Sequence, residues 1–237
     1  MRFMVMHKVD AHMEAGDPPP QGIIEEMGKL VQEHLKTGVF LDGAGLHRSA
    51  LRARVEFDGG KPTVTRGPYQ GSNELVASFT TIEAESIDAA IEVTARIGKA
   101  LGDAEIEIGP VVEPWDLGLA EKPEGVPQRF LLLRKGDRAY EGGAAPPAGL
   151  KKVLDELARD GVVVSTGALA PSATGARYNK KAGKRAWTDG PFTESKELVA
   201  GFSIIQVPTL EDAKRWAERY ADILGDNEVD VRGVAEA

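Results

Sequence analysis

The sequence predicts an α+β fold built from two copies of one small unit, and two observations carry this prediction. The first is an internal repeat: the Gly-Pro-aromatic sequence at residues 67–69 recurs at residues 190–192, and residues 74–79 then correspond without a gap to residues 197–202. The second is that both copies show the same succession of apolar patterns, in the order β-α-β-(hairpin)-β-α-β. A duplicated α/β unit explains both.

The offset between the copies changes once along the chain. Gly67 corresponds to Gly190, an offset of 123 residues, whereas Arg2 corresponds to Arg129, an offset of 127 residues. The difference of four residues falls between residues 22 and 38, where the pattern predicts a helix. Because four residues make about one helical turn, such an insertion keeps the apolar face of the helix aligned.

Each copy begins with a short apolar strand, at residues 3–8 and 130–135, followed by an amphipathic helix that ends at a glycine, Gly38 or Gly161. The other elements follow in equivalent pairs: strands at 39–46 and 162–169, hairpins with turns near 58–60 and 181–183, apolar central strands at 75–82 and 198–207, helices after the N-caps Ser86 and Thr209, and alternating last strands at 105–108 and 228–231.

This order of elements is the ferredoxin-like pattern. Such a unit covers one face of its sheet with helices and leaves the other face bare, and a partly apolar bare face must be buried. We therefore expect the two sheets to pack face to face as a pseudo-dimer. The predicted domains are a first unit at residues 1–113, a linker at 114–127 and a second unit at 128–237.

Composition excludes several classes of function. The chain has a net charge of −8 and no cysteine, which excludes disulfides, thiolate nucleophiles and cysteine-ligated metals and fits a reducing cytoplasm. An acidic chain repels phosphate backbones, so we expect no nucleic-acid partner, and the basic residues at 177–185 are interpreted as a solvated hairpin tip. No apolar stretch approaches the roughly 20 residues of a membrane span. We expect a cytoplasmic protein without a membrane partner.

Three charged positions change between the copies: Asp189, Glu194 and Lys196 correspond to Arg66, Gly71 and Asn73. Asp189 is either a turn aspartate that accepts backbone N–H bonds or a cleft carboxylate that binds or deprotonates a substrate. In the second interpretation, Arg66 pairs with Asp189 across the pseudo-twofold axis. Glu194 and Lys196 fit an exposed ion pair.

Other titratable residues are retained or lie in one copy only. Glu74 and Glu197 begin a central strand in both copies, where a carboxylate is either a strand-edge charge or an acid–base group facing a cleft. His12 follows the first strand, and histidine is the side chain most readily poised near neutral pH. Its spacing to His7 and Glu14 matches no metal-ligand pattern, so no metal is predicted. No nucleotide-binding motif is present, and no cofactor is predicted.

Residues 188–197, which read Thr-Asp-Gly-Pro-Phe-Thr-Glu-Ser-Lys-Glu, resemble the signature of the YCII-related family in its DGPF branch. The resemblance covers the whole chain once per half, with a degenerate motif at residues 66–74. It implies a pseudo-dimeric α/β barrel with a cleft between the two sheets. It also implies a regulatory link to extracytoplasmic-function sigma factors. A His–Asp pair has been suggested as catalytic in the founding branch, and the second copy contains no histidine.

Two functions compete for such a cleft. One is a small-molecule-binding or regulatory module, with the ligand-binding residues Arg66, Tyr69, Glu74, Glu194 and Lys196. The alternative is a cofactor-independent small-molecule enzyme of the isomerase, lyase or monooxygenase type, with Asp189, Glu197 and His12 as catalytic residues. A purely structural or assembly protein is a third interpretation. The enzyme interpretation requires Asp189 or Glu197 to line a buried pocket. The chain is expected to be a monomeric pseudo-dimer or a homo-oligomer.

Overall fold

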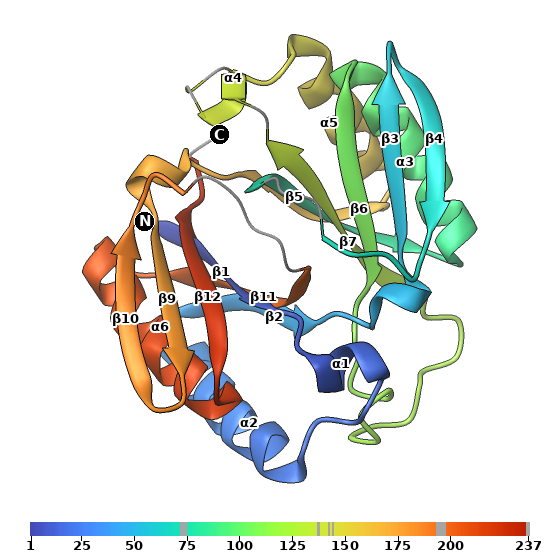
Figure 1. The fold of residues 1–237 in the computed structure, drawn as a ribbon. Coiled ribbons are helices and arrows are strands. Elements are labelled where there is room, and N and C mark those ends of the chain that lie inside the picture. Colours follow the sequence, from blue (N-terminus) through green and yellow to red (C-terminus); the bar gives the residue numbers. More distant parts are fainter. Residues whose placement is uncertain (72–74, 137, 142, 144, 193–197, 236–237) are drawn as a thin grey trace.

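The computed structural model describes all residues except 72–74, 137, 142, 144, 193–197 and 236–237. It is an α+β structure with two six-stranded antiparallel sheets, which confirms the predicted class (Figure 1). The first sheet has the order β10-β9-β12-β1-β11-β2 and the second has the order β4-β3-β6-β7-β5-β8. Within the described residues, no helix combines the length and apolarity needed to cross a bilayer.

The strands of each sheet have the following bounds. The first sheet contains β1 (Arg2–Lys8), β2 (Phe40–Gly45), β9 (Ala176–Lys181), β10 (Lys184–Asp189), β11 (Val199–Gln206) and β12 (Asn227–Gly233). The second sheet contains β3 (Ala53–Asp58), β4 (Lys61–Arg66), β5 (Leu75–Ala84), β6 (Ala104–Pro110), β7 (Gln128–Gly136) and β8 (Val163–Ala168). The predicted strands are therefore present in both copies.

Each sheet combines strands of both copies, which corrects the expectation that each copy folds a sheet of its own. The first two strands of the first copy, β1 and β2, lie in the sheet formed by the last four strands of the second copy. The reverse holds for β7 and β8. The exchanged pairings are equivalent, because Val5 lies opposite Val231 just as Leu132 lies opposite Ile108. The domain boundaries predicted along the chain stay predictions, but the sheets do not follow them.

The linker gives a physical reason for this exchange. It joins β6 to β7, which are neighbouring antiparallel strands of the second sheet. The second copy therefore begins beside the strand that ends the first copy. Because the corresponding strands carry the same apolar pattern, exchanging them keeps the same kinds of contact in both sheets.

Helices from both copies cover the outer face of each sheet (Figure 1). The first sheet packs against α2 (Gln21–Lys36) and α6 (Leu210–Leu224), and the second packs against α3 (Ile87–Leu101) and α5 (Ala148–Arg159). The predicted N-caps are confirmed: the Ser86 hydroxyl accepts a bond from the backbone N–H of Ala89, and Thr209 forms a capping box with Asp212.

The inner faces of the two sheets share a separate core. Along β1, Phe3 and Val5 belong to the helix-side core, whereas Met4 and Met6 belong to a second core that also contains Leu131 of β7. Successive side chains of a strand point to opposite faces, so this second core lies between the sheets. The bare face of each sheet is thus buried against the other sheet.

Candidate functional site

The inner face of each sheet also carries a cluster of buried charges near one end. In the first sheet, Lys8 Nζ lies 2.8 Å from Asp230 Oδ2, and Arg177 Nε lies 2.6 Å from Asp230 Oδ1 and 3.2 Å from Glu228 Oε1. Lys8 comes from the first copy and its partners come from the second. The strand exchange therefore assembles this cluster from both halves of the chain.

The second sheet repeats the cluster at equivalent positions. Lys135 Nζ lies 3.1 Å from Glu107 Oε2, and Arg54 contacts Glu107 at 2.8 Å and Glu105 at 3.2 Å. Burial alone would raise the pKa of Glu107, but the charges of Lys135 and Arg54 outweigh burial and lower it. The same balance, with Lys8 as the leading charge, lowers the pKa of Asp230. Both carboxylates therefore stay ionised and are poor proton donors near neutral pH.

The arginine of each cluster supports a Gly-Pro-aromatic turn. The guanidinium of Arg54 lies 4.4 Å from the centre of the Tyr69 ring, and that of Arg177 lies 4.6 Å from the centre of the Phe192 ring. These are cation–π distances. We call the surroundings of these two rings the Tyr69 site and the Phe192 site.

The glycine of each turn is required by a close backbone approach. A Cβ atom at Gly67 would lie 1.7 Å from the carbonyl oxygen of Ser49, and one at Gly190 would lie 1.7 Å from that of Ser172. In each site the serine belongs to a short 3-10 helix, Ser49–Leu51 or Ser172–Thr174. The turns are thus pressed against these two helices, which explains why Gly-Pro recurs in both copies.

A glutamate completes each site, and neither glutamate was among the predicted catalytic or ligand-binding residues. Glu14, on the short helix α1 (Ala11–Ala15), accepts hydrogen bonds from the backbone N–H and the hydroxyl of Ser49. Glu141, on α4 (Arg138–Glu141), accepts the same two bonds from Ser172. The signal was available, because Glu14 and Glu141 correspond at the offset of the chain start.

The Tyr69 site contains a pocket of about 470 Å³. Its lining includes Val9, Glu14, Ser49, Tyr69, Gln70 and Leu198. Val9 and Leu198 extend from strands of the first sheet, whereas the turn that carries Tyr69 follows β4 of the second sheet, so the pocket lies where the sheets meet. The Tyr69 hydroxyl donates to the carbonyl of Ala53 at 3.1 Å. Burial raises the pKa of Tyr69 above its usual value, so the phenol stays protonated.

Of the ligand-binding residues expected from the sequence, the structure brings Tyr69 to this pocket. Arg66 lies elsewhere, because it pairs with Asp88 at the start of α3. Asp189 ends the edge strand β10 with its side chain 80% exposed, and it lies 3.5 Å from Lys214 Nζ. The expected pairing of Asp189 with Arg66 across the pseudo-twofold axis is therefore wrong.

Of the remaining expected residues, His12 lies at the surface and the other four lie outside the described residues. His12 is 88% exposed, and its Nδ1 lies 3.1 Å from Asp17 Oδ2. Glu74, Glu194, Lys196 and Glu197 fall within residues 72–74 and 193–197, which lie outside the described residues. In the part of the chain that is described, no three carboxylate or imidazole side chains are grouped as a metal site.

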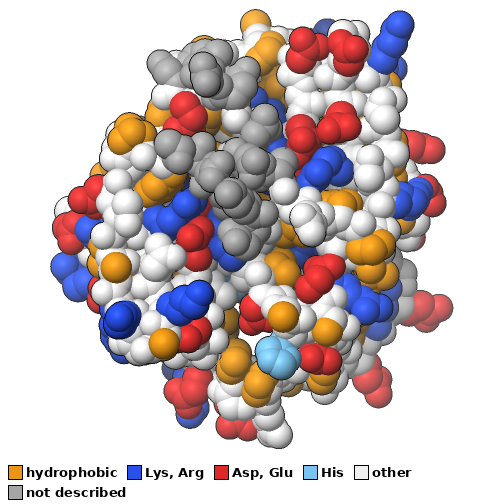
Figure 2. All heavy atoms as spheres, viewed as in Figure 1, with side chains coloured by type: hydrophobic (Ala, Val, Ile, Leu, Met, Phe, Trp, Pro, Cys, Tyr) orange, Lys and Arg blue, Asp and Glu red, His pale blue; other side chains and the backbone are white. Residues whose placement is uncertain are grey.

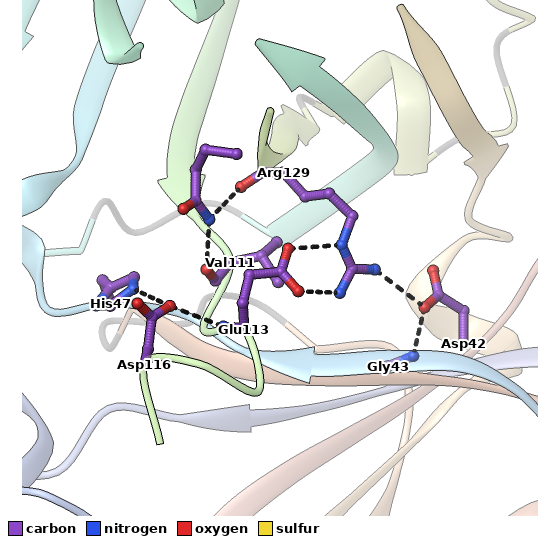
Figure 3. A network of polar contacts seen from close by, with 8 residues as sticks. Asp42, Gly43, His47, Val111, Glu113, Asp116 and Arg129 are labelled. Atoms are coloured by element: carbon purple, nitrogen blue, oxygen red, sulfur yellow. Dashed lines mark hydrogen bonds and ion pairs between the residues drawn. The ribbon is translucent and has the colours of Figure 1, made fainter. Parts of the chain in front are cut away.

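A second polar network fastens the linker to the sheets (Figure 3). Arg129 at the start of β7 donates two bonds to Glu113, at 2.7 and 2.8 Å, and its Nη1 lies 3.8 Å from Asp42 of β2. His47 Nε2 lies 3.2 Å from Asp116 Oδ2. Because these bonds tie Glu113 to β7, connect β7 to β2 through Arg129, and hold the linker residue Asp116 against His47, they favour a structural role for this network.

The surface is mixed in charge. Figure 2 shows acidic and basic side chains interspersed with hydrophobic ones over the described part of one face. A nucleic-acid interface is instead marked by a basic stripe or patch. The described part of this face shows mixed charges and no such stripe.

Comparison with known proteins identifies the family. The family model of the YCII-related domain matches residues 1–113 and again residues 129–226. The chain therefore belongs to the YCII-related family, and the two matched segments are consistent with a tandem duplication. Neither the search of curated proteins nor the search of solved structures found a match.

Proposed function

We propose that this protein is a small-molecule-binding or regulatory module whose ligand lies in a cleft between the two sheets of a pseudo-dimeric α/β barrel. The observation that carries the proposal is the pocket at Tyr69, where elements of both sheets meet. Concave sites with mostly apolar linings and a few polar groups are the usual form of ligand sites, and this pocket has Glu14 and Ser49 as polar groups.

The enzyme alternative has weaker support. It required Asp189 or Glu197 to line a buried pocket, but Asp189 is exposed and Glu197 lies outside the described residues. The carboxylate in the pocket is Glu14, whose two oxygens accept bonds from Ser49. A carboxylate engaged in this way favours shaping a binding site over transferring protons.

The wider setting of the protein remains part of the proposal. Membership of the DGPF branch, a regulatory link to a sigma factor and a cytoplasmic location rest on the resemblance of residues 188–197 and on the lack of cysteine. One chain supplies all the strands of both sheets. The exchanged strands therefore favour a monomer in which the two halves of one chain form the pseudo-dimer.

The test is a thermal-stability screen of the full chain against a metabolite collection, followed by calorimetric titration of the hits. A ligand that binds the folded state raises the melting temperature by an amount that grows with the logarithm of one plus the ratio of its concentration to Kd. Gln70→Trp places a large ring at the exposed rim of the pocket, and Val64→Trp places the same ring on the exposed strand β4 as a control. Binding that survives Gln70→Trp and Val64→Trp equally would contradict the proposed cleft.

A further inference from the structure

The Tyr69 and Phe192 sites each contain one buried arginine, but the two arginines come from different strands. Arg52 precedes β3 and corresponds to Gly175, whereas Arg232 of β12 corresponds to Gly109. A Cβ atom at Gly175 would lie 2.9 Å from Arg232 Cδ, and one at Gly109 would lie 3.7 Å from Arg52 Cδ. Gly175 therefore leaves space that Arg232 fills, whereas a Cβ atom at Gly109 would make only an ordinary contact with Arg52.

The two guanidinium groups occupy equivalent places. Arg52 Nε donates to the carbonyl of His47 at 2.6 Å, and Arg232 Nε donates to the carbonyl of Ala170 at 3.1 Å. His47 and Ala170 correspond at the same offset of 123 residues that relates the two turns. A guanidinium is thus present at the same point of both sites, although different positions in the chain supply it.

The neutralisation of these two charges differs. Arg232 Nη2 lies 3.2 Å from Glu141 Oε1, which pairs the charge with a carboxylate. Arg52 has no such ion pair with the described acidic residues: Glu14 bonds to Ser49 as Glu141 bonds to Ser172, but it forms no ion pair with Arg52. Arg52 Nη1 donates to the carbonyl of Val199 at 2.8 Å, and Nη2 has no hydrogen-bond partner among the described residues.

Such an arrangement is costly without an anion. Arg52 is only 3% exposed, and a guanidinium remains charged in proteins. Burial lowers the pKa of Arg52 although the charges of Glu107 and Glu14 act in the opposite direction, so these carboxylates compensate the buried charge only in part. The two sites therefore differ in one respect: Arg232 of the Phe192 site forms an ion pair with Glu141, whereas Arg52 of the Tyr69 site forms none with a described carboxylate.

Arg52 is hydrogen-bonded to residues that line or adjoin the pocket. The backbone N–H of Arg52 donates to Ser49, its carbonyl accepts from Gly67, and its Nη1 bonds to the residue after Leu198. Ser49 and Leu198 line the pocket. The apolar lining at Val9, Tyr69 and Leu198 suits a hydrocarbon group, and the negative charge of Glu14 disfavours a ligand with several charges.

We infer that the Tyr69 site binds a small organic monocarboxylate whose oxygen accepts a hydrogen bond from Arg52 Nη2, and that the Phe192 site binds none. The inference rests on the proposed function, since it names the ligand class of the same cleft. On this inference the two sites differ: the Tyr69 site binds an anion, whereas in the Phe192 site Glu141 takes the place of the anion beside Arg232.

The test titrates the ¹⁵N-labelled full chain with isobutyrate and benzoate, and separately with isobutyramide and benzamide, at constant ionic strength. The backbone amide signals of Ser49, Tyr69 and Gln70 report on the pocket, and that of Phe192 reports on the other site. We expect saturable shifts at the Tyr69 site with the carboxylates, and binding of the neutral amides that is weaker by about tenfold or more. Equal binding of acid and amide at the pocket would overturn the carboxylate inference and leave the proposed cleft standing. Absence of shifts with all four probes would overturn both.

Two variants sharpen the assignment. Arg52→Met should weaken carboxylate binding by about tenfold or more, whereas Arg232→Met should leave it within about twofold. Equal losses in both variants, or an unchanged affinity in Arg52→Met, would refute the role of Arg52. If Arg52→Met fails to fold, the comparison of acid with amide in the wild-type chain still decides the inference.

Discussion

Among single residues, the buried ion pair of Lys8 with Asp230 joins strands from different copies at 2.8 Å. Lys8→Met removes one charge while leaving Asp230 buried beside Arg177. Breaking a buried pair on one side costs about 3–5 kcal/mol, and we expect about 3 kcal/mol here because Arg177 still compensates Asp230. Urea unfolding monitored by circular dichroism measures the change. Lys29→Met, at an exposed pair, is the control and should stay within about 0.5 kcal/mol; equal effects would contradict the interpretation.

We expect the buried His7 to make the free energy of unfolding depend on pH. Its Nδ1 lies 2.7 Å from the Tyr220 hydroxyl oxygen in the core, and burial lowers its pKa to about 4. A histidine whose pKa falls on folding stabilises the native state fully above its unfolded pKa of about 6.5 and loses that contribution as the pH falls toward 4. Between pH 7.5 and pH 5 this loss amounts to about 2 kcal/mol.

The measurement is the free energy of unfolding at both pH values for the wild type and for His7→Gln. The glutamine does not titrate, so the drop from pH 7.5 to pH 5 should be smaller in the variant by about 2 kcal/mol. Taking this difference removes the contribution of the carboxylates, which titrate in both proteins. Identical pH profiles would show that His7 does not lose its proton affinity on folding.

For individual residues, the comparison of the two copies in the sequence identified only part of the site. It selected Tyr69 because the Gly-Pro-aromatic turn recurs, and that residue does line the pocket. It also selected Asp189 and Arg66, whose direction depends on how the edge strands β10 and β4 end. A repeat shows which residue types are retained, but it does not show which way a side chain points. Arg52 was missed because its counterpart in the other copy comes from a different position, Arg232.

Among the secondary-structure elements, periodicity and capping chemistry predicted the strands and the four long helices. The glycines Gly38 and Gly161, with φ of 71° and 75°, follow the ends of α2 and α5 as the sequence predicts. The short helices α1 and α4 were not predicted, because four or five residues are too few to show a helical period. These two helices carry Glu14 and Glu141. The two glutamates were therefore missed for the same reason as the helices, which are too short to show a period.

The substitution of glycine by alanine should have opposite effects on stability at Gly190, in a Gly-Pro turn, and at Gly28, in a helix. Gly190→Ala forces a methyl group against the Ser172 carbonyl oxygen, which only a backbone shift relieves, so we expect a loss of about 2 kcal/mol or more. Gly28→Ala is the control: Gly28 lies inside α2 with nothing within 4 Å of its Cβ position, and alanine there should stabilise by about 1 kcal/mol. Thermal unfolding of both variants provides the comparison. A Gly190→Ala protein as stable as the wild type would show that the turn adjusts freely.

For the whole molecule, the sequence predicted the duplication and the need to bury two bare sheet faces, but not the exchange of strands. The reason lies in the repeat itself. Residue Val5 of β1 meets Val231, and its counterpart Leu132 meets Ile108, so both pairings satisfy the same apolar pattern. Local patterns cannot distinguish two arrangements whose contacts are chemically equivalent. The choice depends on the path of the linker, which holds β7 beside β6.

The exchange predicts that the two halves of the chain stay together after the linker is cut. A protease site placed at Leu119, an exposed linker residue, would separate β1–β6 from β7–β12 without touching either sheet. Each sheet would still contain strands from both fragments, so separation would expose the inner core and the buried ion pairs. We expect the cut protein to elute from size-exclusion chromatography at the volume of the intact chain and to split only in denaturant. Release of two folded single-copy monomers under native conditions would contradict the exchanged topology, because it would mean that each copy completes a sheet on its own.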